Sequence, residues 1–288
     1  MRLPSLLLLL LLTAAAPTCQ ALETSTFPQR LISLGPINTE NVFLLGAGER
    51  LVANTRYCVR PEAARAREKI GSMLQVSVEK IISLQPDLVL ATAMTRPEQI
   101  RQLRAVGIRV EQFDQPASFR QICDHFRRLG QLLGLEEEAK KIIRQAKAQV
   151  AAVRQQVAGL PPQKVFLQVG SQPLFGSVPS SFTHDFIKLA GGTNIIADQT
   201  LGTTSREKII AKNPHVIIIA IMGSESGIAA QERRKWLAIP VIAAVRQQRV
   251  HIINPNQACS PSPATFAQTL TEIADLIHPQ GAAKNRGR

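Results

Sequence analysis

Short apolar runs alternate with amphipathic segments along most of this chain, a pattern typical of parallel strands connected by helices. In the first half, strands are expected at residues 30–34, 87–90 and 108–113, with helices around residues 100–106 and 119–133. The second half repeats this rhythm, with strands expected at residues 164–169, 216–221 and 249–253 and helices at residues 182–190 and 266–277. The pattern predicts an α/β protein in which parallel strands form sheets covered by helices.

A long stretch without glycine or proline, from Glu136 to Ala158, separates the two halves. Its apolar positions keep one helical stripe, which predicts a single helix roughly 35 Å long. The prolines that follow at Pro161 and Pro162 end it abruptly. The expected organisation is an N-terminal lobe at residues 28–133, a linking helix at 134–160 and a C-terminal lobe at 163–278.

The turn after the first expected strand begins a helix. Gly35-Pro36 breaks the strand, and Asn38 or Thr39 is expected to cap a helix that runs to about Leu45. The start of such a helix offers unpaired backbone amides to a polar or anionic group of a ligand.

Residues 1–21 have the layout of a secretory signal peptide, with Arg2 followed by a run of leucines and small residues before Ala21. Cleavage is expected after Ala21. The alternative is a lipoprotein signal with Cys19 as the lipidated residue, although Thr18 stands where such sites usually have alanine or glycine. No later apolar stretch is long enough to span a bilayer, so the mature chain is expected to be soluble and periplasmic. The basic tail at residues 279–288 is expected to be disordered.

Composition narrows the kind of partner. Aromatic residues make up 4% of the chain, with one tryptophan and one tyrosine, which excludes a large aromatic box as the binding site. The formal net charge is +13, but the basic residues are dispersed over the polar sides of the expected helices. We therefore expect a solvated basic surface and no nucleic-acid partner. An anionic membrane surface or an acidic ligand is the alternative use of this charge.

Two segments, one in each half of the chain, share a motif. The first reads Ser77-Val-Glu79-Lys-Ile-Ile and the second Ser205-Arg-Glu207-Lys-Ile-Ile, and each is followed by a proline and an apolar strand. Because all the matches keep one constant offset, they indicate two duplicated lobes. Each serine stands where a helix N-cap belongs, and each glutamate falls in a first turn, where the helix dipole favours a carboxylate. Glu79 and Glu207 are therefore either ordinary first-turn residues or a functional pair.

These segments resemble those of a known family, the substrate-binding proteins of ABC importers that bind cobalamin, ferric siderophores or haem and have a rigid interlobe helix. The resemblance runs from about residue 28 to 277 and is carried by RLISLGPINTE, EKIISLQPDLVLA, KVFLQVGSQPLFGS, LAGGTNII, TSREKIIAKNP and IPVIAAVRQQRVHII. The chain is most similar to the cobalamin-binding branch. The resemblance implies an α/β fold of two parallel-sheet, Rossmann-like lobes with a ligand cleft between them. It also implies that Glu79 and Glu207 dock on arginines of the importer's membrane subunits.

The resemblance further implies which residues line the cleft. These are Pro36, Ile37, Asn38, Tyr57, Cys58, Met73, Thr92, Phe175, Leu201, Asn254 and Cys259. Tyr57 matches a pocket tyrosine of the family, whereas Met73 and Leu201 stand where the cobalamin binder has tryptophan. Relative to the cobalamin binder, the chain keeps both docking glutamates but differs at these pocket positions. The expected ligand is therefore a corrinoid, haem or ferric chelate, with no cofactor required by the protein itself.

Cys58 and Cys259 leave three alternatives. They form a disulfide across the cleft, they bind a soft metal or the metal of a bound cofactor, or they only line the cleft. Cys123 is expected in the core. The five histidines show no close ligand spacing, so a binder of bare zinc or manganese is not expected.

Two other functions compete with delivery to an importer. An enzyme is disfavoured because the chain has no nucleophile elbow, HExxH, P-loop or GxGxxG motif. A binding protein that feeds a sensor or carries a cofactor would keep the fold without needing the paired glutamates. We expect a monomeric binding protein whose partners are a small molecule and the importer's membrane subunits.

Overall fold

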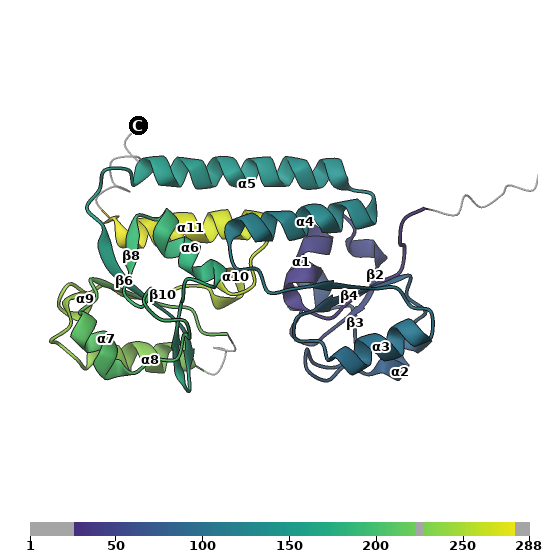
Figure 1. Ribbon diagram of the computed structural model, residues 1–288, viewed down its shortest axis with the longest axis horizontal. Helices are drawn as coiled ribbons and strands as arrows, with labels where there is room; N and C mark the ends of the chain where they lie inside the picture. The colour runs from purple at the N-terminus through teal and green to yellow at the C-terminus, as the bar shows by residue number, and fades with distance from the viewer. Residues whose placement is uncertain (1–25, 223–226, 280–288) are drawn as a thin grey trace, which may run out of the picture.

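The computed structural model describes residues 26–222 and 227–279 and consists of two α/β lobes (Figure 1). The N-terminal lobe contains a parallel sheet in the order β3-β2-β1-β4-β5. Its strands are β1 (Leu31–Ser33), β2 (Leu51–Asn54), β3 (Glu68–Lys69), β4 (Leu88–Thr92) and β5 (Val110–Phe113). β1 and β4 are almost entirely buried, which explains why they read as unbroken apolar runs.

The C-terminal lobe repeats this plan with one antiparallel strand. Its sheet has the order β10-β9-β6-β7, and β8 also pairs with β6. The strands are β6 (Gln163–Ser171), β7 (Leu174–Gly176), β8 (Gly192–Asn194), β9 (Val216–Ile219) and β10 (Val250–Ile252). β7 returns along β6 as a hairpin, while β8, β9 and β10 pair in parallel. The predicted α/β class with two parallel-sheet lobes is confirmed.

Helices cover both sheets and join the lobes. In the N-terminal lobe they are α1 (Pro36–Leu44), α2 (Val78–Ser83), α3 (Pro97–Ala105) and α4 (Phe119–Leu133), with 3-10 turns at Gly48–Arg50 and Glu62–Ala64. α5 (Glu136–Gln156) follows. In the C-terminal lobe they are α6 (Phe182–Leu189), α7 (Arg206–Lys212), α8 (Ile228–Leu237), α9 (Ala243–Arg246), α10 (Pro255–Ala258) and α11 (Pro263–Ile277).

The long helix α5 runs across both lobes along one side of the molecule and packs on α4 and α11 (Figure 1). Its apolar stripe belongs to one hydrophobic cluster that includes Leu31 of the first sheet and Val165 of the second. The core is therefore continuous from lobe to lobe through the helical layer. A shared core of this kind resists wide separation of the lobes, because opening would expose apolar surface.

Stacked aromatic rings also pack where the helices join the two lobes. The ring of Phe266 in α11 lies between those of Phe119 and Phe186, with centroid distances of 4.6 and 4.3 Å. The Phe119 amide also donates a hydrogen bond of 2.8 Å to Asp185 Oδ2 of the C-terminal lobe. The lobes are thus joined by side chains from α4, α6 and α11 as well as by the chain itself.

The first helix differs from the expectation. α1 begins at Pro36 after an extended Gly35, so neither Asn38 nor Thr39 is its cap, and both are buried within the helix. Proline suits the first helical position because it has a fixed φ and lacks the N–H that would be unpaired there. Several elements, among them β2, β7, β8 and α8, were not predicted. These three strands have only three or four residues each, too few to show a clear period.

The repeated motif has the same local structure in both lobes. Ser77 Oγ accepts a hydrogen bond from the Lys80 amide at 3.1 Å, and Ser205 Oγ accepts one from the Lys208 amide at 3.4 Å. The predicted serine caps are confirmed. The equivalence extends further, because Gln85 and Asn213, which correspond at the offset of the repeat, both take positive φ angles of 47° and 45° before the motif proline.

Among residues 26–222 and 227–279, no helix has both the length and the apolar character needed to cross a membrane. The expected signal peptide at residues 1–21 lies outside the described residues, as does nearly all of the expected tail at 279–288.

Candidate ligand cavity and docking helices

A cavity of about 620 Å³ lies between the two lobes. The N-terminal lobe contributes Pro36, Arg56, Tyr57, Val59, Met73, Met94 and Gln115, and the C-terminal lobe contributes Met222, Pro255, Asn256, Cys259 and Ser260. Its volume falls within the range of about 300–1,000 Å³ that is usual for small-molecule sites. The cavity is thus large enough for a small ligand held by both lobes.

The topology explains why these residues meet. Arg56 follows β2, Met94 follows β4, Gln115 follows β5 and Met222 follows β9, so each comes just after the carboxyl end of a parallel strand. In each lobe these ends lie at one edge of the sheet, and ligands of open α/β sheets bind beyond that edge. None of these four residues was predicted from the sequence. Their position after a strand end is the signal that could have identified them.

Sulfur is concentrated in this cavity. All three methionines that follow Met1 in the chain, Met73, Met94 and Met222, belong to the lining, and so does Cys259. Thioether side chains are flexible and polarizable, and they pack well against aromatic faces. Within the described part of the lining, Arg56 is the only side chain charged at neutral pH. The wall therefore suits a ligand with a broad apolar or aromatic face and a negative group.

The structure places some of the predicted ligand-binding residues in the wall of the large cavity. Pro36, Tyr57, Met73 and Cys259 all belong to the cavity lining. Tyr57 is half exposed, and the Arg56 guanidinium carbon lies 5.4 Å from the centroid of its ring. The pair therefore presents a hydroxyl and a positive charge from one loop.

Ile37, Asn38 and Thr92 line a smaller neighbouring hollow of about 70 Å³, which shares Met73 and Met94 with the large cavity. Asn38 is 3% exposed, and its amide donates to the Ala91 carbonyl at 3.1 Å. Thr92 Oγ1 accepts a hydrogen bond from the Met94 amide at 3.2 Å. Both side chains are thus engaged in shaping the β4 loop that carries Met94.

Phe175, Leu201 and Asn254 are not in the lining of the large cavity. Phe175 lies on β7 and Leu201 in the loop before α7, and both are exposed. Asn254 caps α10 by accepting from the Asn256 amide at 3.0 Å, so its neighbours Pro255 and Asn256 face the cavity instead.

Cys58 was expected in the pocket wall and is buried instead. It is 0% exposed, and its Sγ lies 3.2 Å from Thr55 Oγ1 in a tight turn that directs the side chain inward. Cys58 and Cys259 are both free thiols, so these two residues form no disulfide across the cleft. The residues that the structure describes contain no group of three or more His, Cys, Asp or Glu side chains able to hold a metal. Cys123 is buried in α4, as predicted.

A polar bridge between the lobes lies beside the cavity. Glu40 of α1 forms an ion pair with Arg60 and accepts a hydrogen bond of 3.3 Å from Thr265 Oγ1 of α11. Arg60 Nη2 also reaches the Ser260 carbonyl at 3.4 Å. Burial raises the pKa of Glu40, while the charge and hydrogen bonds of Arg60 act in the opposite direction. The bridge joins α1, the Tyr57 loop and the start of α11.

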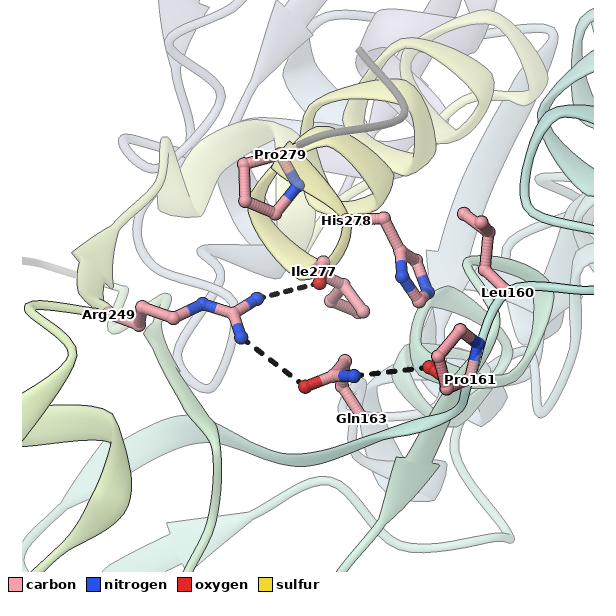
Figure 2. A pocket seen from close by; sticks show the side chains of 7 residues that line it. All are labelled: Leu160, Pro161, Gln163, Arg249, Ile277, His278 and Pro279. Atoms are coloured by element: carbon pink, nitrogen blue, oxygen red, sulfur yellow. Dashed lines mark hydrogen bonds between the residues drawn. The ribbon is translucent and has the colours of Figure 1, made fainter. Parts of the chain in front are cut away.

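A second hollow, of about 290 Å³, lies within the C-terminal lobe and is lined in part by Leu160, Pro161 and His278. Figure 2 shows the Arg249 side chain directed at the chain's own groups, with hydrogen bonds of 2.6 Å to the Ile277 carbonyl and 3.4 Å to Gln163 Oε1. Because its guanidinium is occupied in this way, Arg249 secures the end of α11 and is not free for a ligand.

The two predicted docking residues lie on short helices on the side of the molecule away from α5, one on each lobe (Figure 1). Ser77 Oγ donates to Glu79 Oε2 at 3.1 Å. The Glu207 carboxylate accepts hydrogen bonds from Ser205 and from its own backbone amide. Both lower the pKa of Glu207 and so favour its ionised form. The serine caps therefore also orient the two carboxylates.

Two α/β lobes joined by a long helix, with a cavity between them, define a two-lobed ligand-binding protein with a rigid link. The chain belongs to the periplasmic binding protein family, whose model matches residues 31–256. It is 34% identical to a vitamin B12-binding protein of Yersinia pseudotuberculosis (serotype O:3, strain YPIII) over 218 residues, which are 75% of this chain and 78% of the relative.

Solved structures agree with this assignment. The periplasmic vitamin B12 binding protein BtuF of Vibrio cholerae superposes with a TM-score of 0.73 at 27% identity, covering 87% of this chain and 96% of its own. The periplasmic haem-binding protein RhuT from Roseiflexus sp. RS-1 superposes with a TM-score of 0.78 at 26% identity, covering 88% and 99%. The predicted family is thus confirmed, and these relatives are binding proteins.

Proposed function

We propose that this protein captures a metal-containing cofactor or chelate in the periplasm, a corrinoid, haem or ferric chelate, and delivers it to an ABC importer. The observation that carries the proposal is the sulfur-rich cavity of about 620 Å³ between the two lobes. Relatives named for vitamin B12 and for haem support this ligand class. The protein itself needs no cofactor under this proposal and acts without catalysis, as a monomer.

The cavity lining favours haem or another anionic chelate within that class. Arg56 supplies a positive charge beside Tyr57, and the three methionines supply polarizable contact for a planar ring. The chain's tryptophan, Trp236, is fully buried in the C-terminal lobe and contributes nothing to the cavity. A ligand that relies on tryptophan stacking would find no such surface here.

The ligand is tested by titrating the purified mature chain with three chromophoric probes: haemin, cyanocobalamin and a ferric hydroxamate siderophore. We expect saturable binding of one probe with a visible absorption change. An Arg56→Gln variant should bind an anionic probe more weakly, by about tenfold for a loss of about 1.4 kcal/mol. Failure of all three probes to bind would contradict the proposed ligand class.

Delivery to the importer rests on Glu79 and Glu207, which lie on the capped helices α2 and α7 and match in the internal repeat. The test is capture of the host's membrane proteins by the ligand-loaded chain, with identification of the captured permease by mass spectrometry. We expect Glu79→Arg/Glu207→Arg to abolish capture while ligand affinity is unchanged. Undiminished capture and uptake would favour a sensor or cofactor-carrier role instead.

The proposal includes export, which is supported by the N-terminal sequence, with Arg2 and the leucine run before Ala21. Intact mass of the protein recovered from the periplasm is the test. A mature chain that begins at Leu22 supports cleavage after Ala21. A lipid-modified chain that begins at Cys19 would instead establish a membrane anchor.

A further inference from the structure

The two docking helices share their serine caps but are held to their lobes by different basic residues. On α2, Lys80 Nζ lies 2.9 Å from Glu68 Oε1 and donates to the Lys69 carbonyl at 2.9 Å. The side chains of Lys80 and Glu68 are 41% and 48% exposed. Exposed pairs of this kind contribute little, because water and salt screen them. The ion pair between Lys80 and Glu68 therefore contributes little to holding α2 in place.

On α7, the corresponding ion pair is mostly buried, although the Arg206 side chain itself is 25% exposed. Arg206 forms an ion pair with Glu232 of α8, whose side chain is 2% exposed. The Arg206 guanidinium carbon also lies 4.3 Å from the centroid of the Trp236 ring. Losing one partner of a buried pair costs more than losing one partner of an exposed pair, because the remaining charge is poorly solvated, so this pair should hold α7 more firmly than the Lys80 pair holds α2.

Glu232 is the centre of a network that reaches the sheet. It accepts hydrogen bonds from Gln168 Nε2 at 2.9 Å and from Lys235 Nζ at 2.8 Å. Gln168 lies on β6 and in turn accepts from Trp236 Nε1 at 2.7 Å. Burial opposes ionisation of Glu232, but hydrogen bonds from Lys235 and Gln168 and the charge of Arg206 hold its pKa below the usual value. Arg206 thus connects α7 to α8 and to the middle of the sheet.

The internal repeat provides the comparison within the molecule. When the two motifs are aligned on their serines and glutamates, Arg206 corresponds to Val78, which cannot form an ion pair. The anchor is therefore an addition to the shared motif and is present in one lobe alone. It adjoins Glu207 in the sequence, at the first position of α7.

The geometry points to Arg206 as a positioning residue that fixes α7, through Glu232 and Trp236, so that Glu207 is presented to the membrane partner in one orientation. This inference rests on the proposed docking role of Glu207. It makes the two contacts unequal, because the helix that carries Glu207 has a mostly buried anchor, whereas the Lys80 pair on the helix that carries Glu79 is exposed. Preorganisation raises affinity by reducing the ordering cost that binding otherwise carries.

A double-mutant cycle tests this inference, with affinity measured between the ligand-loaded chain and the captured importer in lipid nanodiscs. Arg206→Met is expected to weaken binding about three- to tenfold. In the Glu207→Gln background, Arg206→Met should weaken binding no further. In the Glu79→Gln background, Arg206→Met should weaken binding as much as it does in the wild type. Val78→Ala, at the matching position of α2, is the control and should have no effect. Arg206→Lys should restore part of the affinity.

The outcomes separate this inference from the proposed function. If Glu79→Gln and Glu207→Gln weaken binding but Arg206→Met does not, the docking role of the glutamates is supported and the positioning role of Arg206 is contradicted. The positioning role is also contradicted if Arg206→Met still weakens binding in the Glu207→Gln background. If neither glutamate matters, the docking proposal itself fails. Should Arg206→Met not fold, Glu232→Gln keeps the side chain's size and removes the buried charge, and the same cycle applies.

Discussion

Thr265 of the C-terminal lobe donates a hydrogen bond of 3.3 Å to Glu40 of the N-terminal lobe, on the carboxylate that also pairs with Arg60. Thr265 takes part in the capping box of α11 with Ser262, whose amide donates to Thr265 Oγ1 at 2.8 Å. The start of α11 and the middle of α1 are thereby tied together beside the cavity. The bridge joins residues 225 positions apart in the chain.

Stability should depend on pH through Glu40. Burial raises its pKa in the folded state above the usual 4.5, so the folded protein binds this proton more tightly than the unfolded chain does. Its contribution to the free energy of unfolding is therefore greatest below pH 4.5 and declines as pH rises through the folded pKa. In urea titrations across this range, Glu40→Gln should gain stability relative to the wild type as pH rises. A constant difference between the two proteins would contradict this assignment.

Removing the Phe266 ring should weaken the junction between the lobes. Phe266 is fully buried between Phe119 and Phe186, so Phe266→Ala is expected to lower the free energy of unfolding by about 3–5 kcal/mol. Thermal unfolding followed by calorimetry should also lose cooperativity and separate into two transitions. Phe166→Ala is the matched control, equally buried in a cluster confined to the C-terminal lobe. It should cost similar stability and leave the two lobes coupled.

Cys259 should be unreactive despite its place in the cavity wall. Burial raises the pKa of its thiol to about 12, and Sγ donates to the Ala220 carbonyl at 3.3 Å. Because the thiolate is the reactive form, alkylation by iodoacetamide at about pH 8 should be slow in the native protein. Mass spectrometry should find Cys58, Cys123 and Cys259 labelled only after unfolding. Rapid native labelling of Cys259 would show that its thiol is ionised and available to a metal.

The three cavity methionines should matter for binding and little for folding. Replacing Met73, Met94 and Met222 with leucine conserves volume, so the free energy of unfolding should change by less than about 1.5 kcal/mol per site. Each lost sulfur contact with a planar ring is worth about 0.3–1.5 kcal/mol, so affinity should fall by about two- to tenfold per methionine. Haemin or cyanocobalamin, whichever binds the wild type, is the probe, measured by absorption titration.

The control for the methionine series is Leu237→Met, which reverses the Met→Leu exchange. Leu237 lies at a partly exposed position of α8, outside the cavity lining. It should leave affinity unchanged. Equal affinity of the triple leucine variant and the wild type would show that sulfur is not part of recognition, and that the apolar volume alone is used.

The sequence by itself determined the local features of this protein. The long apolar stripe predicted α5, the serines and glutamates of the repeat predicted the capped starts of α2 and α7, and apolar runs predicted β4 and β9. These features depend on side-chain periodicity and on hydrogen bonds between near neighbours, which are readable along the chain. The paired glutamates could be located for the same reason.

Only the tertiary structure decided which side chains face the cavity and which support it. A turn at Thr55 directs Cys58 inward, while Met94 and Met222 reach the cavity from loops far apart in the sequence. The anchor of α7 likewise joins Gln168 and Glu232, which are distant in the chain. Such contacts depend on how strands are ordered in a sheet and how two lobes meet, and neither is encoded in the spacing of nearby residues.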